Sequence, residues 1–167
     1  NIGLLDSYVG IVLAHLGALT QATATNGDGV LNLSFLDRPE TSEDAGIRQL
    51  RGFLGKAGIK RGDVYFEEGS GLSRNNLATP NATVALLRYM SRHAEADAFV
   101  NALPVAGVDG TLRHRMKNTP AAGNLRAKTG TLRWANSLSG YVTTAAGEHL
   151  VFSIMLNRYA APDTIHS

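Results

Sequence analysis

The chain of 167 residues contains no cysteine, and this absence removes several kinds of chemistry at once. Disulfide frameworks, thiolate zinc sites, iron–sulfur clusters and a cysteine nucleophile are all excluded. No apolar stretch reaches the roughly 18 residues that a membrane-spanning helix needs. Charged residues make up only 18% of the chain and the formal net charge is +2, so we expect no nucleic-acid partner. Hydrophobic residues reach 44%, which is enough for a folded core.

The spacing of apolar residues predicts helices in the first two thirds of the chain and strands in the last third. The predicted helices cover residues 3–19, a segment from Thr41 or Ser42 to about Gly58, a segment opening at Thr79-Pro80, and 94–102. The predicted strands cover residues 64–66, 125–132, 136–144 and 149–157, with a hairpin at 145–148. Because helices precede an antiparallel meander, the order indicates one α+β domain.

The predicted strand over residues 149–157 has an unusual composition. Its residues from His149 to Leu156 are almost continuously apolar. Strands of this kind are usually covered on both faces. We therefore expect this strand to lie at the centre of the sheet.

A polar, glycine-rich loop surrounds Ser73 and Asn75. These two residues are two apart, so in an extended segment their side chains point to the same side. A hydroxyl and an amide that converge there could relay a proton and hold a substrate amide. The plainer alternative is a polar loop that caps the following helix.

A second candidate lies where the strand pattern begins, in Ala127-Lys128-Thr129-Gly130-Thr131. The ammonium of Lys128 and the hydroxyl of Thr129 can both donate to one carboxylate. Gly130 carries no side chain, so a ligand could lie against the strand edge, where the amide of Thr131 could donate to a developing oxyanion. The plainer alternative is a surface strand with an exposed lysine.

Taken together, the two candidates resemble two signature motifs of the penicillin-recognising serine enzymes. The flanking sequence is similar to the D-alanyl-D-alanine carboxypeptidase/endopeptidase family of the penicillin-binding protein 4 type (class C, low molecular mass), over about residues 45–158. The stretches that carry this resemblance are Glu68–Arg74, Asp109–Leu112, Thr119–Gly123, Ala127–Leu132 and Ser137–Val142.

The resemblance implies a role for each candidate residue. Ser73 would pass a proton to the leaving amine, and Asn75 would bind the substrate peptide carbonyl and help to orient the catalytic lysine. Lys128 and Thr129 would bind the terminal carboxylate of a stem peptide ending in D-Ala-D-Ala, or of a β-lactam. The backbone amide of Thr131 would form part of the oxyanion hole. The implied reaction is acyl transfer through a serine ester, without a cofactor or metal.

The resemblance also implies a fold and a location. We expect a partial β-lactamase/transpeptidase-like fold of the α+β or α/β class, with packed helices on an antiparallel sheet. Residues 1–167 would form the C-terminal part of this domain, and the missing N-terminal part of the same protein would complete it. The expected location is the periplasm or another extracytoplasmic part of the cell envelope.

The sequence departs from the family pattern in one respect. The family nucleophile is the serine of a Ser-x-x-Lys motif, and none of the serines in this chain has lysine three residues later. We therefore expect the chain alone to be inactive and the longer parent protein to be the carboxypeptidase. Two alternatives stay open, namely a noncatalytic peptidoglycan-binding module and a related serine esterase or β-lactamase.

Overall fold

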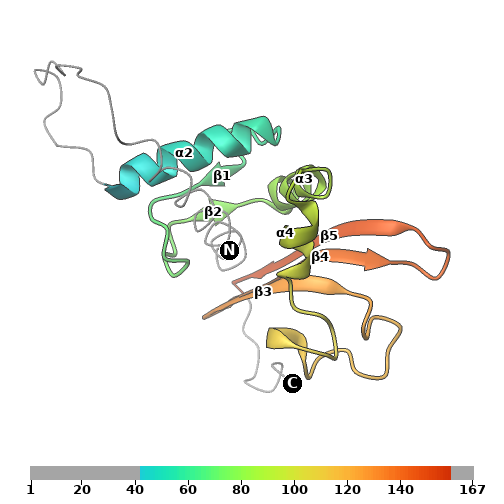
Figure 1. Cartoon of the computed structure of the whole chain (residues 1–167). Helices are drawn as coiled ribbons and strands as arrows, with labels where there is room; N and C mark the ends of the chain where they lie inside the picture. The colour runs from blue at the N-terminus through green and yellow to red at the C-terminus, as the bar shows by residue number, and fades with distance from the viewer. Residues whose placement is uncertain (1–41, 159–167) are drawn as a thin grey trace, which may run out of the picture.

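The computed structural model describes residues 42–158, and the predicted helix over residues 3–19 lies outside this part. The described residues form three α-helices, a short 3₁₀ turn and two antiparallel sheets (Figure 1). Within residues 42–158, no helix combines the length and the apolar character that crossing a bilayer requires. The α+β class predicted from the sequence is therefore observed in the described part.

Helix α2, Ser42–Lys56, matches the predicted second helix. Its apolar positions Ile47, Leu50 and Leu54 recur at helical spacing and are all buried. The chain leaves the helix through Gly58, whose φ of +79° is the left-handed conformation that favours glycine after a helix. The burial of one apolar stripe thus fixes how α2 sits on the core.

Helix α3, Pro80–Met90, begins at the predicted position. Thr79 is the N-cap, and its Oγ1 accepts a hydrogen bond from the amide of Ala82 at 3.1 Å. Proline costs no intrahelical hydrogen bond in the first turn, because the N–H groups there have no partner within the helix. Helix α4, Ala96–Asn101, lies inside the predicted segment 94–102.

A small sheet precedes α3. Strand β1, Val64–Tyr65, was predicted, and it pairs antiparallel with β2, Leu77–Ala78, which was not. The two strands hold the ends of the loop that contains Ser73 and Asn75. The predicted polar loop is therefore closed at its base by a short β-ladder.

The larger sheet consists of β3, Arg126–Leu132, β4, Ala135–Thr143, and β5, His149–Asn157. The strand order is β3-β4-β5, and both pairs are antiparallel. All three strands agree with the predicted segments to within one residue, and the predicted hairpin joins β4 to β5. The meander is thus observed as expected.

The predicted central position of the last strand is wrong for the described sheet. Strand β5 lies at one edge and β4 lies in the centre. Leu150, Ile154 and Leu156 of β5 are 46%, 54% and 54% exposed. An apolar run reports a tendency to be buried, but it does not determine which strands pair.

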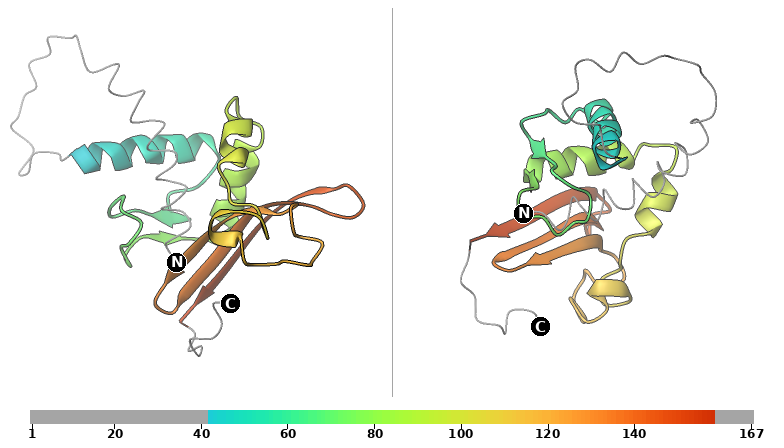
Figure 2. Two further views of the ribbon diagram at one scale, coloured as in Figure 1. Left: turned by 60° about the horizontal axis from the view of Figure 1, so that its bottom comes forward. Right: turned by 90° about the vertical axis from the view of Figure 1, so that its left-hand side faces the viewer.

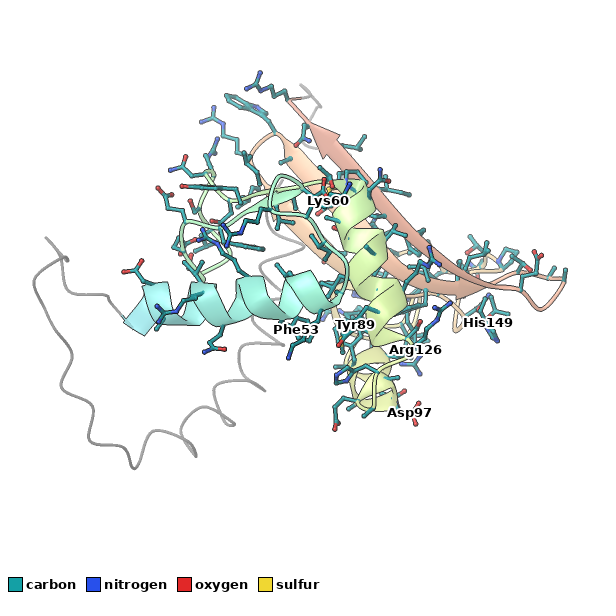
Figure 3. All side chains as sticks on the ribbon, turned by 90° about the horizontal axis from the view of Figure 1, so that it is seen from above. Phe53, Lys60, Tyr89, Asp97, Arg126 and His149 are labelled. Carbon is teal, nitrogen blue, oxygen red and sulfur yellow. The ribbon has the colours of Figure 1, made fainter. Side chains whose placement is uncertain are left out.

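One core cluster joins the three α-helices to one face of the large sheet. Helix α3 packs against β5 and β4, as two views of the ribbon show (Figure 2). The hydroxyl of Tyr141 donates to the carbonyl of Leu87 at 2.7 Å, and burial raises the pKa of this tyrosine above its ordinary range. The rings of Phe53 and Tyr89 meet edge to face where α2 and α3 approach each other, with centroids 5.6 Å apart (Figure 3).

A second core cluster covers the opposite face of the sheet, since successive strand residues point to opposite faces. Its fully buried residues are Ala106, Leu112, Leu125 and Ala127, and Leu138, Val142 and Phe152 pack against them. Leu112 comes from the 3₁₀ turn η1, Gly110–Leu112. The segment before β3 is therefore packed tightly onto β3 itself.

Candidate active site

The loop between β1 and β2 is held by a buried asparagine. Asn76 is only 1% exposed. Its Oδ1 accepts hydrogen bonds from the amides of Glu67 and Glu68 at 2.7 and 3.3 Å, and its Nδ2 donates to the carbonyl of Glu68 at 2.9 Å. One side chain thereby forms hydrogen bonds with three backbone groups of the loop.

The carboxylate of Glu68 organises the middle of the same loop. It accepts hydrogen bonds from the amides of Ser70 and Ser73 at 2.8 and 3.0 Å. Hydrogen bonds from Ser70, its hydroxyl first, and from the amides of Ser73 and Leu72 lower the pKa of Glu68 below its usual value, because they stabilise the ionised form. The glycine-rich segment is thus folded around a carboxylate.

Ser73 and Asn75 converge on one atom. The hydroxyl of Ser73 donates to Oε2 of Glu67 at 3.1 Å, and Nδ2 of Asn75 donates to the same oxygen at 2.7 Å. The backbone amide of Asn75 also donates to Oγ of Ser73 at 3.1 Å. The hydroxyl of Ser73 and the side-chain amide of Asn75 therefore lie together, and Glu67 is a third member of this group that was not predicted from the sequence.

Lys128 lies on the face of β3 opposite to the second core cluster, because its neighbour Ala127 is buried in that cluster. Its side chain is half-buried, and its Nζ donates to the carbonyl of Thr129 at 2.9 Å. Burial lowers the pKa of this ammonium below the ordinary lysine value, because removal from water disfavours the charged form. An incoming carboxylate would compensate this desolvation.

Strand β3 is the edge of the large sheet on the side away from β4. The amide of Ala127 donates to the carbonyl of Pro104, which lies on that side, at 3.0 Å. Because hydrogen-bonding direction alternates along a strand, the backbone groups of Thr129 and Thr131 face the same side. The edge thus presents the amide of Thr131 beside the carbonyl that Lys128 contacts.

The remaining predicted residues of this strand have distinct surroundings. Thr129 shares the face of Ala127, so its side chain leaves the strand on the opposite side from that of Lys128. Gly130 is buried, and its carbonyl accepts the hydroxyl of Ser137 at 3.5 Å. The hydroxyl of Thr131 is exposed and lies 2.9 Å from Oδ1 of Asn136.

The structure forms two groups from the predicted residues. Ser73 and Asn75 are held by Glu67, and the side chains of Lys128 and Thr129 make their hydrogen bonds on β3 and η1. In residues 42–158, no direct hydrogen bond links one group to the other. The same described part contains no cluster of three metal-ligating side chains.

Two residues that contact the candidate site were not predicted from the sequence. Glu67 was hidden because it lies six residues before Ser73, and only the fold of the loop brings them together. Thr111, whose Oγ1 lies 2.9 Å from that of Thr129, is 18 residues away in the sequence. The only signal for Thr111 was its place in one of the stretches that carry the family resemblance, Asp109–Leu112.

The comparison with protein families agrees with the resemblance. The profile of the D-Ala-D-Ala carboxypeptidase 3 (S13) family matches residues 32–167. The chain therefore belongs to this family, and the family prediction is confirmed. The match extends beyond both ends of the region from which the resemblance was drawn.

Two curated relatives illustrate the similarity. The chain is 34% identical over 132 residues to D-alanyl-D-alanine carboxypeptidase DacB of Haemophilus influenzae, covering 78% of this chain and 27% of the relative. It is 40% identical over 124 residues to the D-alanyl-D-alanine carboxypeptidase of Actinomadura sp. (strain R39), covering 71% of this chain and 23% of the relative. The chain thus spans about a quarter of the length of these relatives.

The solved structures show the fold family. Penicillin-binding protein 4 (dacB) from Haemophilus influenzae superposes with a TM-score of 0.65 at 34% identity, covering 72% of this chain and 27% of that chain. The same protein has been solved in complex with a β-lactam. The predicted fold class, a partial transpeptidase-like α+β fold, is confirmed by this similarity.

Proposed function

We propose that this chain is the C-terminal part of a serine-type D-Ala-D-Ala carboxypeptidase, with possible endopeptidase action as a variant of the same chemistry. The substrates would be peptidoglycan stem peptides ending in D-Ala-D-Ala, and β-lactams would acylate the same serine. Family membership and the names of the relatives support this proposal. The enzyme would act outside the cytoplasm, where peptidoglycan lies.

The proposed reaction proceeds in two steps. A serine oxygen attacks the carbonyl carbon of the penultimate D-Ala, the peptide C–N bond breaks, and the terminal D-Ala leaves as an amine. Ser73 would deliver the proton that this amine needs, while Asn75 would hold the substrate peptide carbonyl. Water then cleaves the ester, which releases the shortened peptide and regenerates the serine.

The observation that carries the proposal is the arrangement at the edge of β3, where the described residues place no further strand beyond the single bridge between Val105 and Arg126. A half-buried ammonium, a threonine hydroxyl and outward-facing backbone groups lie within four residues there, from Lys128 to Thr131. Lys128 and Thr129 would reach the substrate carboxylate from the two sides of this edge, and the amide of Thr131 would stabilise the oxyanion. A substrate lying along the edge would meet all three groups.

A noncatalytic peptidoglycan-binding module is the second candidate, and one observation favours it. The 167 residues contain no Ser-x-x-Lys, so the carboxylate-binding groups occur here without the family nucleophile. A module of this kind would bind peptides ending in D-Ala-D-Ala without cleaving them. The gene sequence preceding Asn1 separates the candidates, because an in-frame Ser-x-x-Lys favours the enzyme and its absence favours the module.

Labelling with a fluorescent penicillin tests the proposal. We expect the longer protein that carries this chain to retain the label on a denaturing gel, and the 167-residue chain to retain none. Pre-incubation with unlabelled penicillin should abolish the signal, which provides the control for specific acylation. A stable covalent label on the chain alone would refute the claim that it lacks the nucleophile. An unlabelled longer protein containing Ser-x-x-Lys would refute the acyl-enzyme mechanism.

A further inference from the structure

The segment before β3 places a hydroxyl against the carboxylate-binding motif. Oγ1 of Thr111 lies 2.9 Å from Oγ1 of Thr129, although neither side chain is buried. An exposed hydroxyl can satisfy itself with water, so burial does not force this contact. From this juxtaposition we propose that Thr111 is a positioning residue that orients the hydroxyl of Thr129 toward the substrate carboxylate.

The segment that carries Thr111 is held on several sides. The carboxylate of Asp109 accepts the amide of Val105 at 2.7 Å, and the amide of Gly107 donates to the carbonyl of Leu112 at 2.9 Å. Leu112, the neighbour of Thr111, is fully buried in the second core cluster. Thr111 is therefore presented by a fixed turn.

Gly110 allows this turn to lie close to the preceding chain. Its φ is +52°, in the left-handed region, and a Cβ at this position would come within 3.0 Å of the Pro104 ring. The carbonyl of Pro104 in turn accepts the amide of Ala127 at the start of β3. The turn and the start of β3 thus both contact Pro104, which brings the backbones of Thr111 and Thr129 close together.

The chemistry of a hydroxyl explains why a second one is useful. Thr129 has one proton to donate and two lone pairs that can accept. A bound carboxylate only accepts, so the proton of Thr129 must point toward the carboxylate. Thr111 can then donate its own proton to Oγ1 of Thr129. In the structure Oγ1 of Thr129 donates to Oγ1 of Thr111, so carboxylate binding would reverse the direction of this bond. Each bond in the resulting chain then strengthens the other.

This inference rests on the proposed carboxylate-binding role of Thr129. Its test uses the longer enzyme and compares second-order acylation rate constants for a penicillin and for the methyl ester of the same penicillin, which lacks the carboxylate. We expect Thr111→Val, which keeps the shape and removes the hydroxyl, to lower the ratio of the two constants about three- to tenfold. Thr111→Ser restores the hydroxyl and should return the ratio to within about twofold of the native value.

The possible outcomes separate the inference from the proposed function. If Thr129→Ala lowers the ratio and Thr111→Val does not, Thr111 has no positioning role and the proposed function stands. If Thr111→Val slows both compounds equally, its effect is on the scaffold and the inference is overturned. If neither Thr129→Ala nor Lys128→Ala changes the ratio, the proposed carboxylate site itself is wrong.

Discussion

Replacing Lys128 by alanine in the longer enzyme is expected to slow acylation by carboxylate-bearing β-lactams roughly 10- to 150-fold. The ammonium projects from β3, which is an edge strand of the described sheet, and it donates to the carbonyl of Thr129. A hydrogen bond to a charged group contributes about 1.5–3 kcal/mol, and each 1.36 kcal/mol changes a rate about tenfold. Stopped-flow measurement of the second-order rate constant gives the effect directly.

A second lysine provides the matched control for this experiment. Lys117 is exposed and precedes the Thr119–Gly123 stretch. Lys117→Ala removes the same charge from the protein, and the rate constant should stay within about twofold, because an exposed charge acts through water and salt. Equal rate constants for native enzyme and Lys128→Ala would contradict the role assigned to Lys128.

The largest effect on stability is expected at Gly140, in the centre of β4. A Cβ at this position would collide with the carbonyl of Arg126 and would come within 2.6 Å of Cα of Ala127. Both atoms belong to the main chain of β3, so no side-chain rotation can relieve the clash. We expect Gly140→Ala to lower the free energy of unfolding of the chain by about 3 kcal/mol, at the upper end of ordinary overpacking costs.

Replacing a glycine by alanine in α2 should have the opposite effect on the free energy of unfolding. Gly52 lies in the middle of this helix, and among the described residues no atom apart from its chain neighbours and the nearby helix backbone lies within 4 Å of the Cβ that alanine would add. Because alanine favours the helix over glycine, Gly52→Ala should raise the free energy of unfolding by about 0.5–1 kcal/mol. Urea unfolding followed by circular dichroism measures both variants. A Gly140→Ala chain as stable as the native one would show that β3 and β4 are not packed as described.

Local signals in the sequence predicted most of the elements. The Thr79-Pro80 pair marks the start of α3 because capping and proline geometry depend only on neighbouring residues. The three strands of the large sheet follow from composition and a four-residue turn. The position of β5 at the edge could not be predicted in this way, because strand order depends on contacts between segments that are distant in the sequence.

The candidate site was predicted unevenly for the same reason. The closeness of Ser73 and Asn75 follows from their spacing, but their common partner Glu67 depends on how the loop folds around Asn76. The neighbourhood of Thr129 and Thr111 depends on the packing of a turn against β3. Side-chain contacts across 18 residues carry no periodic signal, so only coordinates reveal them.

We propose that the edge of β3 binds the carboxylate while Ser73 protonates the leaving group of the same substrate. A crystal structure of the longer enzyme acylated by a penicillin tests it most directly, through the distances from the penicillin to these side chains. We expect the carboxylate oxygens to lie within about 3.2 Å of Nζ of Lys128 and Oγ1 of Thr129, and the ring nitrogen to lie at hydrogen-bond distance from Oγ of Ser73. A carboxylate bound away from β3, or a ring nitrogen out of reach of Ser73, would contradict it.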